Sequence, residues 1–292
     1  MNDVKRRIIL ESRCSLSVND GMLQIERNED TSQLSFDTIE SLCFAARLHS
    51  SLDVQVIQEC LKRGIQLMFE DEKHQVNSQI HSLYGTNDTS GKIKKQTSWE
   101  QDRKKQLTIY ILKNKIVNQE SVLTHFNLDT EEVLSSYPLS LEEDPDGNKE
   151  GIAARIYFSR LFGHHFDRRM EGNLNAMLNY GYALLASRIT QSIVGYGYLT
   201  QIGIHHCSNT NPFNLTYDFI EPFRPLVDRY VYLRREKEEF TYADKKNMLS
   251  IMDEIIHYGK QKWEVGTAID VYVLDCLKYM NWQKNLPKEI SL

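Results

Sequence analysis

The sequence predicts an α+β protein in which a small, mainly β N-terminal domain precedes a larger, all-α C-terminal domain. Short apolar runs separated by turn residues fill residues 1–84, as expected of strands. The stretch 85–91 reads GTNDTSG, which is the composition of a linker. Beyond it, apolar residues recur mostly at helical spacings. We therefore expect domains at 1–84 and 92–292, joined by the linker 85–91.

The N-terminal domain is predicted to hold short strands and one helix. Asn19-Asp20-Gly21 separates two alternating runs and is a strong hairpin signal. Apolar residues at positions 54, 57 and 61 predict a helix over Asp53–Arg63, which Gly64 ends. The expected strands are Arg7–Glu11, Ser15–Val18, Met22–Glu26, Gln33–Phe36, Ile39–Phe44 and Ile65–Phe69.

The C-terminal domain is predicted to be helical almost throughout. An irregular connection, marked by Pro138, Pro145 and Gly147, interrupts the helices before Glu150. No apolar run approaches the roughly 20 residues that a membrane span needs, so we expect a cytoplasmic protein without a membrane partner. The expected helices are Trp99–Asn118, Gly151–Phe162, Asn173–Tyr196, Phe219–Phe240, Asp244–Tyr258 and Ala268–Trp282.

Composition limits the functional classes. The five cysteines are scattered and form no CxxC pair, which argues against a zinc knuckle or a disulfide framework. Cys207 adjoins His206, but a small buried or half-buried thiol is the favoured interpretation. The net charge of −5 argues against a simple basic DNA-coating protein. Positive charge is nevertheless concentrated in one region, which holds Lys92, Lys94, Lys95, Arg103, Lys104, Lys105, Lys113 and Lys115.

The stretch Gly203–Arg224, GIHHCSNTNPFNLTYDFIEPFR, concentrates the residues that carry chemistry. His205 and His206 lie at the edge of a polar loop. If the following segment is helical, Asp218 and Glu221 are three residues apart and share a face. Imidazole and carboxylate groups together suit a divalent ion such as manganese or magnesium. So short a segment rarely encloses a metal alone, and a ligand from elsewhere in the chain is therefore expected.

Glu150 is the obvious supplier of that ligand, and the residues around it bear a family resemblance. It precedes a Gly-x-Ala-Ala unit and the run Tyr157–Gly163, and Asn173–Tyr182 follows. With Gly203–Arg224, these motifs resemble the Cas1 family, the CRISPR-associated integrase and metal-dependent nuclease of spacer acquisition. Gly-Ile-His-His and Glu-Pro-Phe-Arg resemble the type II subtype of that family. The resemblance covers most of the chain from Gly85 to Asp228.

The resemblance implies a site and a reaction. Its motifs carry over as a catalytic ligand set of Glu150, His206 and Glu221, with Asp218 and His205 in supporting positions. The implied cofactor is Mg²⁺ or Mn²⁺, which activates a hydroxyl for attack on a phosphodiester. Attack by the 3′-hydroxyl of a DNA strand gives integration by transesterification, and attack by water gives cleavage.

The resemblance also implies partners. They are double-stranded DNA, a second copy of the chain and a small companion subunit. An accessory ring-forming subunit and the effector nuclease are further expected partners. The N-terminal β domain is expected to serve dimerisation. Arginines near the site are expected to hold DNA phosphates, and they are Arg155, Arg168, Arg169 and Arg224.

Two alternatives remain open from the sequence. One is an all-α metal phosphohydrolase acting on nucleotides, which would use His164, His165 and Asp167 together with Asp218. The other is a non-catalytic scaffold that binds DNA or protein. In the run KNKIVNQ, Lys115 and Asn118 are expected to be structural or to contact the backbone.

Overall fold

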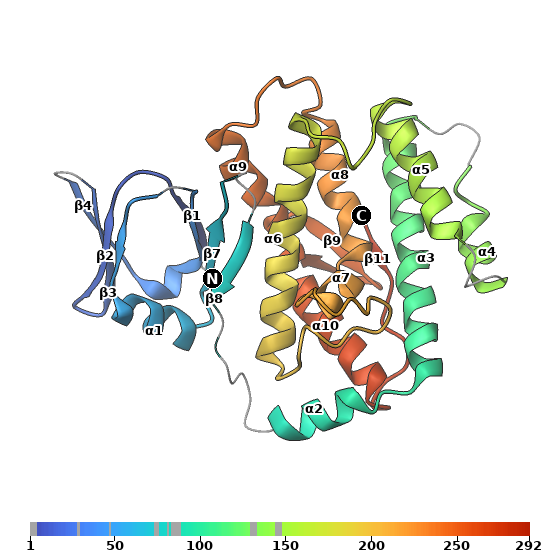
Figure 1. Cartoon of the computed structure of the whole chain (residues 1–292), viewed down its shortest axis with the longest axis horizontal. Helices are drawn as coiled ribbons and strands as arrows, with labels where there is room; N and C mark the ends of the chain where they lie inside the picture. Colours follow the sequence, from blue (N-terminus) through green and yellow to red (C-terminus); the bar gives the residue numbers. More distant parts are fainter. Residues whose placement is uncertain are drawn as a thin grey trace. The chain divides into compact units, whose positions relative to one another are not determined.

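We describe a computed structural model of the chain over residues 5–27, 30–46, 48–72, 76–80, 82, 89–128, 133–143 and 148–292 (Figure 1). The chain divides into two compact units. The first comprises Met1–Leu83 and Tyr242–Leu249, and the second comprises Tyr84–Thr241 and Ser250–Leu292. The first is rich in strands and the second in helices, so the predicted α+β class is confirmed.

The first unit contains two sheets within the described residues. One has the strand order β1-β5-β7-β8, in which β1, β5 and β7 run parallel and β8 runs antiparallel to β7. The other has the order β4-β3-β2-β6. The elements are β1 (Arg6–Leu10), β2 (Ser15–Asn19), β3 (Met22–Arg27), β4 (Asp30–Leu34), the 3-10 turn η1 (Phe36–Thr38), β5 (Ile39–Phe44), β6 (Ser51–Leu52), α1 (Val54–Lys62), β7 (Gln66–Glu70) and β8 (Val76–Ile80).

Local sequence explains these elements. Asp20 and Gly21 both have positive φ, 50° and 74°, as the two central residues of a tight β2–β3 hairpin require. The Asp53 side chain caps α1 by accepting a hydrogen bond from the amide of Gln55. Gly64 follows the helix in a left-handed conformation. The predicted hairpin and helix are therefore confirmed.

A segment from late in the chain completes the first unit. Helix α9 (Tyr242–Met248) belongs to it, whereas from the sequence these residues are expected in the C-terminal domain. The Tyr242 hydroxyl donates to the carbonyl of Ile9. Lys245 Nζ lies 2.9 Å from Glu70 Oε2, and both side chains are buried. A buried ion pair between residues so far apart in sequence has no local signal, and the predicted boundary misses it for that reason.

The second unit is built from helices around α6, most of which is buried. The long helix α3 contacts α5 and η2, and α6 contacts α8 and α10 (Figure 1). The elements are α2 (Thr89–Thr97), α3 (Gln101–His125), α4 (Tyr137–Glu143), α5 (Lys149–Phe162), α6 (Asn173–Gly195), α7 (Asn214–Phe219), the 3-10 turn η2 (Glu221–Phe223), α8 (Arg224–Tyr232), the 3-10 segment η3 (Leu249–Asp253), β9 (Ile255–Tyr258), β10 (Gln261–Glu264), α10 (Val265–Met280) and β11 (Ile290–Ser291).

The second unit is not all-α, which corrects the predicted class of this domain. The helix predicted over Asp244–Tyr258 is wrong beyond η3. Its last residues form β9, which pairs antiparallel with both β10 and β11. Gly259 has a φ of +61° and makes the turn between β9 and β10. Residues of β9 alternate between exposed and buried, a period-two pattern that the prediction overlooks.

The helix predicted over Phe219–Phe240 is also broken. Helix α7 ends at Phe219, the turn η2 follows, and α8 ends at Tyr232. Pro222 and Pro225 each lack the amide proton that a continuous helix needs, so the chain turns twice here. Because of this break, the side chains of Asp218 and Glu221 do not share one helical face as predicted, and each points to different partners.

Two further expectations fall partly outside the described residues. Of the predicted linker, residues 85–88 lie outside them, and residues 89–91 are the first turn of α2. In the irregular connection before Glu150, Pro145 and Gly147 also lie outside them. Within the described residues, no helix combines the length and the apolar character needed to cross a lipid bilayer.

Candidate active site

The segment Ile204–His206 is wrapped around one buried carboxylate. Asp218, on α7, accepts hydrogen bonds from the backbone amides of Ile204 at 2.6 Å, His205 at 3.2 Å and His206 at 2.9 Å. Its Oδ1 also lies 2.7 Å from His206 Nδ1. Three amides and one ring nitrogen satisfy a carboxylate whose side chain is 2% exposed. Asp218 therefore positions both the loop and the His206 ring.

Gly203 makes this wrapping possible. A Cβ atom at this position would lie 2.3 Å from the His206 carbonyl oxygen and 2.7 Å from Asp218 Oδ2. Neither approach is tolerable, and the first involves backbone that cannot rotate away. The glycine of the Gly-Ile-His-His motif is thus explained by close packing against the residues it positions.

His206 has one ring nitrogen engaged and its side chain 42% exposed. The hydrogen bond to Asp218 raises the pKa of His206, and the nearby charges of Asp218 and Glu221 raise it further. A carboxylate on Nδ1 fixes the orientation of the ring and leaves Nε2 as the nitrogen for a ligand. His205 is exposed, and its ring packs edge-on against that of His206.

Glu150 and Glu221 converge on one lysine. Lys115 Nζ, from α3, lies 2.6 Å from Glu150 Oε1 and 2.6 Å from Glu221 Oε2. Glu150 is in the first turn of α5, and Glu221 begins η2. Asn118, one helical turn after Lys115, donates to the carbonyl of Pro222 at 2.9 Å and so fixes η2 against α3. Two carboxylates far apart in sequence therefore face the same cation.

Arg224 holds the other oxygen of Glu221. Its Nε lies 2.9 Å from Glu221 Oε1, and its guanidinium lies 4.6 Å from the centre of the Tyr182 ring. Burial alone would raise the pKa of Glu221, but Arg224 and Lys115 outweigh it and hold that pKa at about 2. Glu221 is therefore a charged, oriented carboxylate over the whole physiological range of pH.

The donor atoms of the predicted ligands suit a hard divalent cation, although the structure brings only some of these ligands together. Within the described residues, no group of three or more His, Cys, Asp or Glu side chains is arranged to hold a metal. Glu150 and Glu221 nevertheless both contact one positive charge, the Lys115 ammonium, and both would be available to hold a divalent cation. Carboxylate oxygens with an imidazole nitrogen are donors that Mn²⁺ and Mg²⁺ accept.

The alternative cluster of His164, His165, Asp167 and Asp218 is not brought together. His164 Nδ1 lies 2.7 Å from Ser159 Oγ. Asp167 pairs with Arg169 at 2.7 Å. Asp218 is fully engaged by the Ile204–His206 segment. His164, Asp167 and Asp218 thus have separate structural partners. Among the described residues no three such side chains are arranged to hold a metal, so the phosphohydrolase alternative lacks a common site.

The four candidate arginines are placed differently. Arg224 lies in the site, and Arg155 is exposed on α5. Arg168 donates to the side chains of Asn175 and Asn179 in α6. Arg169 is exposed and pairs with Asp167. Of the four, Arg155 and Arg169 present mainly exposed side chains.

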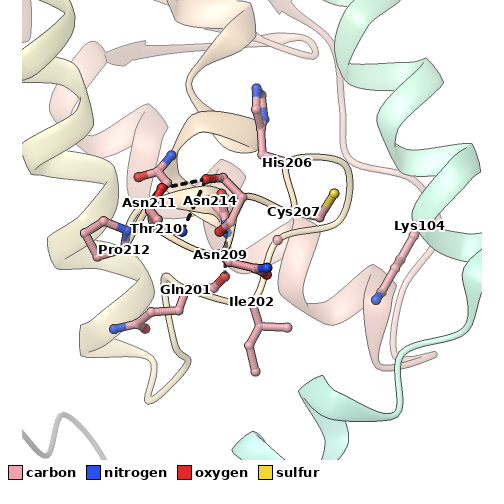
Figure 2. Close-up of a pocket in the computed structure, with 12 residues that line it drawn as sticks. Lys104, Gln201, Ile202, His206, Cys207, Asn209, Thr210, Asn211, Pro212 and Asn214 are labelled. Carbon is pink, nitrogen blue, oxygen red and sulfur yellow. Dashed lines mark hydrogen bonds between the residues drawn. The ribbon is translucent and has the colours of Figure 1, made fainter.

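A polar pocket of about 560 Å³ opens beside His206. Figure 2 shows His206 at one end of it and Lys104, from α3, at its side. Asn214 shapes the pocket because its amide donates to the carbonyls of Gln201 and Ser208, at 3.0 and 2.8 Å. Cys207 also lines it and is exposed, which corrects the expectation of a buried or half-buried thiol.

Lys115 is the residue that sequence reasoning misses. From the sequence, Lys115 and Asn118 are both expected to be structural or to contact the backbone, and of the two it is Asn118 that makes a backbone contact. A signal is present, because Asn114, Lys115 and Asn118 form a polar stripe that is buried on an otherwise apolar helix face. A buried lysine requires an acidic partner, but the sequence does not say which one.

Comparison with known proteins identifies the family. The family model described as CRISPR associated protein Cas1 matches residues 8–255. The chain belongs to the Cas1 family, and the resemblance drawn from its motifs, including the type II subtype, is confirmed. It is 29% identical over 273 residues to a CRISPR-associated endonuclease Cas1 of Neisseria meningitidis, covering 92% of this chain and 90% of the relative. It is 27% identical over 277 residues to one from Francisella tularensis subsp. novicida, covering 86% of each.

Solved structures share the fold. A casposase bound to integration product superposes with a TM-score of 0.80 at 16% identity, over 97% of this chain and 92% of that one. A Cas1 protein from Thermotoga maritima gives 0.78 at 16% identity, over 97% and 99%. A chain of a Cas6-RT-Cas1–Cas2 complex gives 0.75 at 15% identity, over 97% of this chain and 36% of that one.

Proposed function

We propose that this protein is a divalent-metal-dependent DNA endonuclease and integrase that inserts short DNA segments into a CRISPR repeat array. The observation that carries the proposal is the convergence of Glu150 and Glu221 on one cation position in a member of the Cas1 family. Curated relatives that match most of the chain are named CRISPR-associated endonucleases. A solved structure with the same fold is titled as a casposase bound to an integration product.

Glu150, Glu221 and His206 would hold the metal. When bound, Mg²⁺ or Mn²⁺ supplies a Lewis acid that stabilises charge on the phosphodiester and lowers the pKa of the attacking hydroxyl. Asp218 keeps His206 oriented through Nδ1, so that Nε2 is free of that bond. Arg224 keeps Glu221 charged and fixed. His205 is proposed to line the site.

The reaction class follows from the nucleophile. In strand joining, the 3′-hydroxyl oxygen of the incoming DNA forms a bond to phosphorus, and a P–O bond of the target strand breaks. The leaving 3′-oxygen takes up a proton. In hydrolysis, a water molecule is the nucleophile at the same site in place of the 3′-hydroxyl. Phosphate charge would be neutralised by Arg155, Arg168, Arg169 and Arg224, of which Arg224 lies against Glu221.

The partners are proposed on the same grounds. Double-stranded DNA is the substrate. A neighbour in fold is part of a Cas1–Cas2 complex by its title, which supports a small companion subunit of that kind. We propose a homodimer that pairs through the strand-rich first unit. The accessory ring-forming subunit and the effector nuclease complete the proposed set, and the protein is proposed to act in the cytoplasm.

The test is strand joining by single variants of the three ligands. Glu150→Gln, His206→Ala and Glu221→Gln are each expected to reduce strand joining by at least about a hundredfold, because each removes a donor to the metal. DNA binding, measured separately and without metal, should change little. Glu264→Gln, which alters an exposed carboxylate at the start of α10, is the control and should keep full activity. Full activity in any ligand variant would contradict the site.

A further inference from the structure

Lys115 is the most unusual charged residue of the site. Its side chain is 10% exposed and is shared between two carboxylates at 2.6 Å. Coulombic attraction to Glu221 and Glu150 raises the pKa of Lys115 against the opposing effect of burial. The lysine therefore carries its charge in the folded protein, at the point that both carboxylates face.

The electrostatics of the pair favour such a cation. Two carboxylates that face the same point repel each other, and a cation placed between them offsets that repulsion. Arg224 reaches Glu221 through Oε1. Lys115 reaches Glu221 through Oε2 and also binds Glu150 Oε1. The lysine is therefore the one described cation that contacts both acids.

A metal and this ammonium compete for the same oxygens. A divalent ion held by Glu150 and Glu221 would draw on the carboxylate oxygens that Lys115 Nζ now contacts. Both cations cannot occupy the position between these oxygens at once. Metal binding therefore demands that the lysine side chain withdraw.

We propose that Lys115 is an internal counter-ion that holds Glu150 and Glu221 in place before the metal binds and must be displaced when it does. This inference rests on the proposed function, since it takes these two carboxylates as metal ligands. Lys115 acts as a positioning residue through the acids. It preorganises the ligands at the cost of weaker metal affinity.

The displaced ammonium needs a new anionic partner. A lysine is rarely stable when it is buried without one. The substrate phosphodiester is the anion that arrives at the same place, and a lysine is a common phosphate binder. Metal binding should therefore free the Lys115 ammonium to bind a DNA phosphate. Metal and DNA should then each strengthen the binding of the other.

The first experiment is a titration with Mn²⁺ alone, without DNA. Lys115→Met removes the competing charge and nearly keeps the volume. We expect it to bind Mn²⁺ about tenfold or more tightly than the unaltered protein. Its melting temperature without metal should be lower, and Mn²⁺ should raise it by more than in the unaltered protein. A merely structural lysine predicts the opposite change in affinity.

Matched variants complete the test. Lys115→Arg keeps a charge at the position, and Lys113→Met removes a charge two residues away on the same helix. Both should bind Mn²⁺ much more weakly than Lys115→Met does. Lys115→Gln replaces the methionine variant if that one does not fold. Equal affinity in the unaltered protein and Lys115→Met, with tight binding in both, would overturn this inference alone. Absence of Mn²⁺ binding in both would overturn the proposed function with it.

The second experiment measures DNA affinity with and without Mn²⁺. In the unaltered protein the metal should strengthen DNA binding both directly and through the released lysine. In Lys115→Met only the direct contribution remains, so the strengthening by Mn²⁺ should be several-fold smaller. The same strengthening in both proteins would overturn the proposed transfer of Lys115 to the phosphate.

Discussion

At the scale of single residues, Asp218 organises the site without being one of the proposed ligands. Four nitrogens from Ile204–His206 converge on it, and they include the ring nitrogen of the proposed histidine ligand. Gly203 is the residue that lets the chain come so close to that carboxylate. The position of His206 is therefore set by contacts that involve no metal.

Gly203→Ala is predicted to reduce strand joining about a hundredfold, because the added Cβ would displace the His206 backbone and misplace the ring. Strand joining and the melting temperature are the measurements. Gly195→Ala is the matched control, since a Cβ at Gly195 meets nothing within 4 Å, and it should leave activity unchanged. Normal activity in Gly203→Ala would show that the tight approach to Asp218 is not needed.

The residues of the site differ in whether their roles could be predicted from the sequence. Glu150, His206 and Glu221 could be named because their motifs resemble a family, and the structure brings Glu150 and Glu221 to one point. Lys115 could not be assigned, because its role depends on two carboxylates 35 and 106 positions further along the chain. Long-range ion pairs of this kind leave no periodic signal in sequence. The roles of the three proposed ligands remain predictions.

At the scale of elements, helix α8 is tied to α6 through a buried acid. The Tyr182 hydroxyl donates to Asp228 Oδ1, and Asp228 is 1% exposed. Burial raises the pKa of Asp228 to about 6, although its hydrogen bonds and nearby arginines act in the opposite direction. Since α8 follows directly on η2, this contact also supports the element that presents Glu221.

The Asp228 carboxyl is predicted to make stability fall as pH rises from about 4 to 7. Its folded-state pKa lies above the unfolded value, so the folded protein binds the extra proton in this window. The stabilisation is complete below the unfolded pKa and is lost through about 6, with a size of roughly 3 kcal/mol for two pKa units. Asp228→Asn cannot titrate there. Its stability relative to the unaltered protein, measured by urea unfolding, should therefore improve between pH 4 and 7, and a constant difference would contradict the prediction.

Elements were predictable where their signal was local. The β2–β3 hairpin, α1, α5 and α6 follow from turn residues, caps and apolar spacing. Strand β9 was mistaken for helix because four residues are too few to separate the two periods. The helix predicted across Pro222 and Pro225 is wrong because the prediction gave apolar content more weight than the amide donors that the two prolines lack.

At the scale of the whole molecule, charge is unevenly distributed. The chain has a net charge of −5, yet six basic and only two acidic side chains lie between positions 92 and 105. Gln96 of α2 ties this basic segment to the loop before Gly203, through bonds to the carbonyls of Leu199 at 2.8 Å and Ile202 at 3.0 Å. Positive charge is thereby held next to the loop that carries His206, which favours a DNA-binding face there.

Replacing the exposed pair Lys94 and Lys95 by alanine is predicted to weaken DNA binding at every sequence and to flatten its salt dependence. Each lost phosphate contact should reduce the slope of log K against log salt by about 0.9. Binding isotherms at several salt concentrations measure it. Alanine at Lys260 and Lys262, also exposed but on the β9–β10 hairpin, should leave the slope unchanged. Equal slopes for the two double variants would place the DNA elsewhere.

The return of the chain to its first unit has a practical consequence for engineering. Because α9 supplies Lys245 to the buried Glu70, a truncated chain that stops near residue 84 would lose this buried ion pair. The β-rich half cannot be exchanged with that of a homologue by a single cut. A viable chimera has to take both the N-terminal strands and helix α9 from the same parent, as two separate inserts.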